Sequence, residues 1–251
     1  MERWLARLSR SSQLDDFVLK GGMLLAAYGR RRPTADADAL ARNMPGDEKM
    51  VANRVAEIAS LPDPDGGVEY LPDTLTTRVI RDDALYAGVR VSMGARIATA
   101  AVRLRLDVNF GDPVTPAPRI VEVPALRPGV AAIRVLGYPI ETVIAEKLAT
   151  AVALGAANTR VRDYADLYTL ITSRELEDDA VRRAVRATAS FRGTALRPLT
   201  EVTSALVALR SGAYAAYRAG LGMSGQDLPE DFADLVRVVA AFGDRVLPRA
   251  K

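Results

Sequence analysis

The chain has 251 residues, 49% of them apolar and 26% charged, and it contains no cysteine and no histidine. This length can bury a sizeable core as one large domain or two small ones. Without histidine and cysteine there is no serine–histidine–aspartate triad, imidazole base, thiol nucleophile, disulfide or iron–sulfur or zinc site. Catalysis would therefore rest on carboxylates, lysine, arginine, hydroxyls and a hard, oxygen-binding cation.

The charge is nearly balanced, with 34 basic and 31 acidic side chains and a net charge of +3. Only four of the 34 basic residues are lysine, so 30 are arginine. High-GC codon usage explains this excess by itself, although arginine forks also suit phosphate. The N-terminus lacks the apolar stretch of a signal peptide, and no run of about 18 apolar residues could span a bilayer. We therefore expect a cytoplasmic protein without a membrane partner.

Apolar periodicity predicts strands mixed with a few helices in the first half of the chain. Residues 16–28 read as a strand, a Gly-Gly turn and a helix, and residues 46–61 as a helix. Consecutive antiparallel strands are expected at 75–81, 87–96 and 100–110, followed by strands at 120–123 and 132–136.

The second half reads as almost wholly helical, and Pro139 suits the first turn of its first helix. Helices are predicted at 140–154, 161–171, 178–188, 199–209 and 229–246. The predicted fold class is therefore α+β, with a mixed-sheet domain over 1–137 followed by a C-terminal helical bundle over 138–251.

Paired carboxylates give the first chemical signal. Gly21-Gly22 is followed, thirteen residues later, by Asp36-Ala37-Asp38. On a strand over 35–40, Asp36 and Asp38 would share one face, and the alanines would face the core. Two such carboxylates repel each other unless a cation lies between them, so the pair suits Mg²⁺ and a triphosphate.

A third carboxylate follows the same logic. In the strand at 100–110, Asp107 shares the polar face with Arg105 and Asn109. If this strand neighbours the Asp36 strand, Asp107 lies beside the pair, and three carboxylates on one face suit metal-assisted nucleotidyl transfer. Each signal has an ordinary alternative, because an Asp-x-Asp pair is often a solvated edge and a Gly-Gly pair only a turn.

Five ordered motifs resemble a known family. They are V-L-K-G-G-M-L-L-A-A-Y-G, T-A-D-A-D, L-D-V-N-F-G-D, A-E-K-L-A and R-D-Y-A-D-L-Y, from about Phe17 to Leu170. Together they resemble the AbiEii toxins, including the MenT-type toxins, which have the nucleotidyltransferase fold. The resemblance implies a sheet domain with the nucleotidyltransferase fold and a helical domain that completes the active-site cleft.

The resemblance also implies a role for each motif. Gly21 and Gly22 would wrap the triphosphate of an NTP substrate, and Asp36 and Asp38 would bind Mg²⁺ with Asp107 beside them. Lys147 would reach the nucleotide phosphates, and Asp163 would complete the pocket with Asp166 as its neighbour.

The residues themselves leave other interpretations open for the last three positions. Lys147 borders an apolar helix stripe, so its side chain could simply extend past it to solvent. Asp163 and Asp166 lie three apart on one helix side and could pair with Arg160 or Arg162.

Further residues were considered for phosphate and RNA. Thr34 lies two positions before Asp36, and its hydroxyl would face the nucleotide, so phosphorylation there would block the site. Arginines that could hold RNA phosphates, or could simply be solvated, are Arg30, Arg31, Arg32, Arg182 and Arg183. Tyr214 and Tyr217 could stack on bases, but core packing is the expected role.

The sequence thus predicts a Mg²⁺-dependent nucleotidyltransferase toxin. By resemblance, its acceptor would be the 3′ end of tRNA, which blocks translation, and its partner a cognate antitoxin encoded alongside; we expect a monomer. One alternative is a small-molecule transferase of the antibiotic-modifying kind. The other is a non-catalytic nucleotide-binding module.

Overall fold

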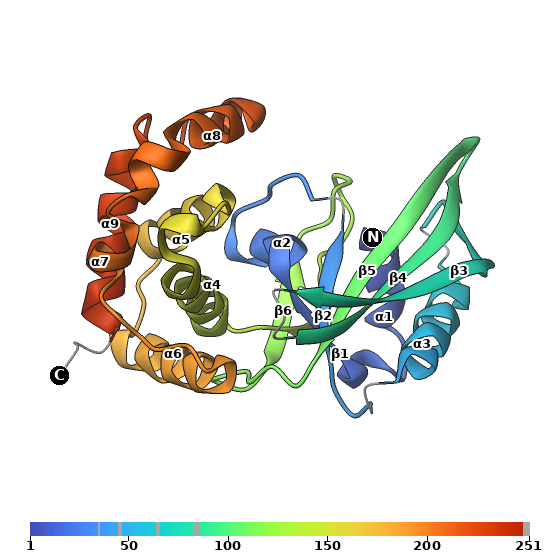
Figure 1. Ribbon diagram of the computed structural model, residues 1–251. Coiled ribbons are helices and arrows are strands. Elements are labelled where there is room, and N and C mark those ends of the chain that lie inside the picture. The colour runs from blue at the N-terminus through green and yellow to red at the C-terminus, as the bar shows by residue number, and fades with distance from the viewer. Residues whose placement is uncertain (35, 45–46, 64–65, 83–85, 248–251) are drawn as a thin grey trace. The chain divides into compact units, whose positions relative to one another are not determined.

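A computed structural model describes the chain except residues 35, 45–46, 64–65, 83–85 and 248–251. The backbone forms two compact units. Unit 1 comprises residues 1–112 and 118–138, and unit 2 comprises residues 113–117 and 139–251 (Figure 1). Among the described residues, no helix is long and apolar enough to cross a membrane.

Unit 1 is built on a mixed seven-stranded sheet in the order β3-β4-β5-β2-β1-β7-β6. The strands are β1 (Phe17–Lys20), β2 (Ala37–Ala41), β3 (Val68–Asp82), β4 (Tyr86–Ile97), β5 (Ala100–Phe110), β6 (Arg119–Val123) and β7 (Ile133–Gly137). β3, β4 and β5 form the predicted antiparallel meander, while β2 runs parallel to β5 and β1 parallel to β7. The α+β prediction is confirmed, because a helical part follows this mixed sheet.

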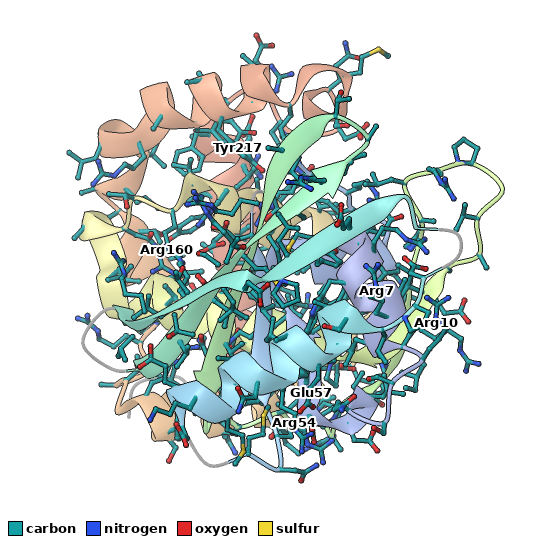
Figure 2. All side chains as sticks on the ribbon, turned by 90° about the vertical axis from the view of Figure 1, so that its right-hand side faces the viewer. Arg7, Arg10, Arg54, Glu57, Arg160 and Tyr217 are labelled. Carbon is teal, nitrogen blue, oxygen red and sulfur yellow. The ribbon has the colours of Figure 1, made fainter. Side chains whose placement is uncertain are left out.

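In the described part of unit 1, the α-helices beside the sheet are α1 (Glu2–Leu8), α2 (Gly21–Leu24) and α3 (Glu48–Ser60). α3 packs against β3 through the apolar stripe expected from sequence, which includes the fully buried Val51, Val55 and Ile58. Arg54 and Glu57, three residues apart on this helix, form an ion pair with 3.1 Å between Nη1 and Oε2 (Figure 2). The sequence did not predict α1, although Trp4 on this helix is fully buried against Phe17.

Unit 2 is helical. Its helices are α4 (Ile140–Leu154), α5 (Val161–Thr172), α6 (Asp178–Arg192), α7 (Leu199–Thr203), α8 (Leu206–Gly220) and α9 (Phe232–Val246). The prediction of a single helix at 199–209 is wrong, because a turn at 204–205 separates α7 from α8, and α8 continues to Gly220. In α8 only Leu206 and Tyr214 are buried, so the apolar pattern that would mark its length is weak.

Candidate active site

The Gly-Gly segment joins β1 to α2 without a separate turn. Gly21 has φ of +65°, and a Cβ added there would lie 2.0 Å from Oδ2 of Asp38. Any side chain would therefore collide with this carboxylate. A Cβ added at Gly22 would lie 3.0 Å from the Thr34 hydroxyl. Both glycines thus let the backbone approach two of the predicted site residues.

The three predicted carboxylates lie in the expected part of the sheet. β2 pairs with β5 in parallel, and Asp38 lies directly opposite Asp107. The condition set from sequence, that these two strands be neighbours, therefore holds. Ala37 and Ala39 are buried on the other face, as the alternation predicts. Asp36 differs from the expectation because it lies just before β2, where its carbonyl accepts a hydrogen bond from the Thr34 hydroxyl at 3.0 Å.

Two arginines face these carboxylates. Arg90 on β4 forms a fork with Asp107, with Nε to Oδ1 at 2.7 Å and Nη2 to Oδ2 at 2.6 Å. This pairing, with smaller contributions from Asp36 and Asp38, raises the pKa of Arg90. Arg105 lies 3.8 Å from Asp36. The sequence assigned neither arginine a role in the site, although it placed Arg105 on the same strand face as Asp107.

The carboxylates were tested for their fit to a divalent cation. Among the described residues, no group of three acidic side chains has the geometry of a metal site. Arg90 bonds both oxygens of Asp107, the third carboxylate that was predicted to contribute to the metal site. Oδ1 of Asp36, by contrast, is buried without a hydrogen-bond partner. A buried carboxylate oxygen without a hydrogen-bond partner is a suitable ligand for a hard cation, and Asp38 lies only two residues further along the chain. Asp36 and Asp38 therefore form the candidate metal pair.

A buried ion pair that the sequence analysis did not single out lies next to the glycines. Lys20 on β1 lies opposite Asp38 on β2, and its ammonium donates to Oδ2 of Asp112 at 2.7 Å. The side chains of Lys20 and Asp112 are 10% and 2% exposed, and Lys20 also lies 5.1 Å from the ring centre of Tyr138. Both residues stand inside quoted motifs, V-L-K-G-G and L-D-V-N-F-G-D, so their positions were the available signal.

Unit 2 brings together the remaining predicted site residues. Nζ of Lys147 on α4 donates to Asp163 at 2.6 Å and to Asp166 at 3.0 Å, both on α5. Burial lowers the pKa of Lys147, but the two carboxylates outweigh this effect and raise it. Burial likewise opposes ionisation of Asp163, yet Lys147 holds the pKa of its carboxyl below the ordinary value. An ammonium has three N–H donors, so one remains beyond these two bonds.

The arginines that were expected to hold RNA differ from one another in burial and in their partners. Arg30 is 7% exposed, so little of its side chain is accessible to an RNA phosphate in this structure. Arg31 donates to the carbonyl of Pro124, and Arg182 pairs with Asp179, whereas Arg183 is exposed. Tyr214 stacks on Phe232 at 4.8 Å and is buried, in agreement with the expected core role.

Comparisons with known proteins give the class and then the family. The fold is similar to MenT4, a nucleotidyltransferase toxin from Mycobacterium tuberculosis H37Rv, with a TM-score of 0.59, 20% identity, and coverage of 98% of this chain and 80% of that one. It is also similar to JHP933 from Helicobacter pylori, with a TM-score of 0.54, 16% identity, and coverage of 97% and 87%. No curated protein matches the sequence significantly. The chain has a nucleotidyltransferase fold.

The family follows from sequence. The model described as "Nucleotidyl transferase AbiEii toxin, Type IV TA system" matches residues 3–238. The chain belongs to this family and is a nucleotidyltransferase toxin of a type IV toxin–antitoxin system. That activity uses an NTP, and the system includes a cognate antitoxin. The non-catalytic alternative is therefore wrong.

Proposed function

We propose that the chain is a Mg²⁺-dependent, cytoplasmic and monomeric toxin that transfers nucleotides from an NTP to the 3′ end of tRNA and so blocks translation. The observation that carries the proposal is the register that sets Asp38 opposite Asp107, with Gly21 against Asp38. This arrangement puts a close backbone approach for a triphosphate beside carboxylates suited to a cation. Mg²⁺ bound there would neutralise the triphosphate charge.

In this proposal, the candidate site residues act by positioning the reacting groups and neutralising their charge. The backbone at Gly21 and Gly22 orients the triphosphate. In unit 2, the family resemblance assigns Lys147 to a nucleotide phosphate, and one N–H of its ammonium remains for that contact. Asp163 and Asp166 hold the Lys147 ammonium in place. An acceptor hydroxyl then attacks the α-phosphorus in line, and pyrophosphate leaves. Such transfer depends on positioning and charge neutralisation, which agrees with a chain that lacks histidine and cysteine.

The proposal is tested by incubating the protein with Mg²⁺, each α-labelled NTP in turn, and total tRNA. We expect label in tRNA, and no label when periodate has oxidised the terminal ribose. Asp36→Ala should abolish transfer, whereas Asp234→Ala on the exposed face of α9 should not. Label only in small molecules would contradict the RNA acceptor and support the antibiotic-modifying alternative.

Thr34 provides a separate test of regulation at this site. Its hydroxyl lies 3.0 Å from the position that a Cβ on Gly22 would take, and it donates to the carbonyl of Asp36. A phosphate there would place about two negative charges beside the carboxylates and the proposed triphosphate. We therefore propose that Thr34 phosphorylation blocks the toxin. Thr34→Glu should lose most transfer and Thr34→Val little; full activity in Thr34→Glu would contradict this proposal.

A further inference from the structure

A groove of about 410 Å³ lies on the arm that β3, β4 and the first half of β5 form in unit 1. β2 pairs with β5 only from Leu106 onward, so residues 100–105 extend beyond β2 as part of this arm (Figure 1). The groove lining includes Thr74, Thr76, Ser92, Gly94, Arg96 and Arg103.

The sheet register connects this groove to the carboxylates. Arg90 lies opposite Asp107, and two residues further along β4, Ser92 lies opposite Arg105. Gly94 then lies opposite Arg103. Residues two apart on a strand share a face, so these rows follow one another on the face of Asp107 at about 7 Å per row. The groove therefore begins one row from the candidate active site.

The groove is lined by both apolar and polar groups, and its polar part includes a bulge in β3. β3 has a bulge between Leu71 and Thr76, where Pro72 supplies no N–H to the ladder. The Thr74 hydroxyl fills this gap, since it accepts from the N–H of Gly94 at 2.8 Å and donates to the Leu71 carbonyl at 2.7 Å. A Cβ on Gly94 would lie 2.9 Å from that hydroxyl oxygen. The bulge thus places the Thr74 hydroxyl beside Gly94, which has no side chain, in the lining of the groove.

The arginines around the groove are loosely held. Arg78 and Arg103 have no hydrogen-bond or ion-pair partner within the described part of the chain. Arg96 and Arg105 have only contacts of 3.8 Å, with Glu69 and Asp36. Several other surface arginines form tight pairs within the protein: Arg10 with Asp63, Arg54 with Glu57, Arg182 with Asp179, Arg237 with Asp234 and Arg245 with Asp178. The arm therefore offers positive charge that internal ion pairs do not neutralise.

We propose that this groove binds the phosphate backbone of the single-stranded 3′ end of the RNA acceptor and leads its terminal hydroxyl to the row of Asp107. The inference rests on the proposed function and names the acceptor subsite. Charge complementarity supports it, because arginine forks bind phosphates and the Ser92 hydroxyl in the lining adds a neutral donor, as in sequence-independent contacts to a nucleic-acid backbone.

The test compares two charge reversals in the full chain. Arg96→Glu/Arg103→Glu changes the groove, and Arg119→Glu/Arg134→Glu, at exposed positions on β6 and β7, is the matched control. Binding of a fluorescent single-stranded RNA is measured by anisotropy over a salt series, alongside binding of a fluorescent NTP analogue. We expect roughly tenfold weaker RNA binding and a salt slope lower by about 1.4 for the groove variant only, the amount for two lost phosphate contacts on a single strand.

The other results separate the two proposals. Both variants should keep wild-type NTP binding and melting temperature, because the four residues are not buried. Wild-type RNA affinity in the groove variant, or an equal loss in both variants, would overturn the groove. RNA binding is read without catalysis, so absence of transfer by the wild-type protein would overturn the proposed function and leave the groove testable. Arg96→Lys/Arg103→Lys should restore most RNA affinity.

Discussion

At the residue scale, the site depends on what is missing from a side chain as much as on what is present. Gly21 combines positive φ with a Cβ direction that points into the Asp38 carboxylate. No L-amino acid with a side chain fits both conditions without moving Asp38. The sequence predicted Gly21 as a turn residue. The contact of Gly21 with Asp38 could not be predicted, because it depends on the pairing of β1 with β2.

Gly21→Ala should therefore damage catalysis more than stability. We expect the unfolding free energy to fall by about 1–2 kcal/mol because of the positive φ. Displacement of Asp38 by an ångström or so should lower nucleotide transfer about 100-fold. Gly212→Ala on α8, where a Cβ meets no atom within 4 Å, is the control and should keep full transfer. Urea unfolding and the labelled-NTP assay measure both effects, and full transfer by Gly21→Ala would contradict the role of this glycine.

At the element scale, strand pairing converts a local pattern into a charged row. Lys20, Asp38, Asp107 and Arg90 are consecutive partners across β1, β2, β5 and β4. The carboxylates could be predicted because alternation within one strand is local. Arg90 could not, since its partner lies 17 residues away and depends on the register of the β4–β5 hairpin. Asp36 was placed on a strand that begins one residue later, at Ala37.

Arg90→Gln tests the row. The variant leaves the 9% exposed Asp107 without its two charge-assisted hydrogen bonds, which should lower the unfolding free energy by about 1.5–3 kcal/mol. It also removes a positive charge near Asp36 and Asp38, so Mn²⁺ should bind more tightly and the NTP more weakly. Chemical denaturation and Mn²⁺ titration measure these changes. Arg78→Gln, at the partner position on β3, should change stability by less than about 0.5 kcal/mol.

A second element-scale prediction concerns α4 and α5. Lys147→Met leaves Asp163 and the fully buried Asp166 without their cation, which should cost about 3–5 kcal/mol near neutral pH. The raised pKa of Lys147 means that its contribution is complete below 10.5 and lost at higher pH. The lowered pKa of Asp163 means that its contribution is present above 3.8 and lost as pH falls further.

The stability difference between wild type and Lys147→Met should therefore be largest between these limits and shrink in acid. Urea unfolding at neutral pH and at about pH 3 measures it, with Lys49→Met on the exposed side of α3 as the control. A difference that stayed constant down to low pH would contradict the ion-pair explanation. If the Lys147 side chain only extended past the apolar stripe to solvent, Lys147→Met would destabilise the protein little. The same experiment therefore distinguishes the two interpretations of Lys147.

At the scale of the whole molecule, most element types follow from sequence because apolar periodicity and caps are local signals. The residues that surround the candidate site follow less well. α8 was missed because few of its side chains are buried, and the groove on the arm arises from a bulge that no periodicity marks. The five motifs identified the family, while the placement of arginines on faces needed the three-dimensional pairing of the strands.

The whole-molecule charge predicts how transfer responds to salt. A net charge of only +3 provides little general attraction, so RNA binding should depend on local arginine–phosphate contacts. The KM for tRNA should rise steeply with salt, whereas the KM for a trinucleotide acceptor, which has only two phosphodiesters, should rise much less. kcat should change little for either, since salt screens encounter and binding more than a desolvated site. Steady-state transfer between about 50 and 200 mM salt measures both acceptors. Equal slopes for tRNA and trinucleotide would mean that contacts beyond the 3′ end contribute nothing, and would assign all acceptor binding to the row of Asp107 itself.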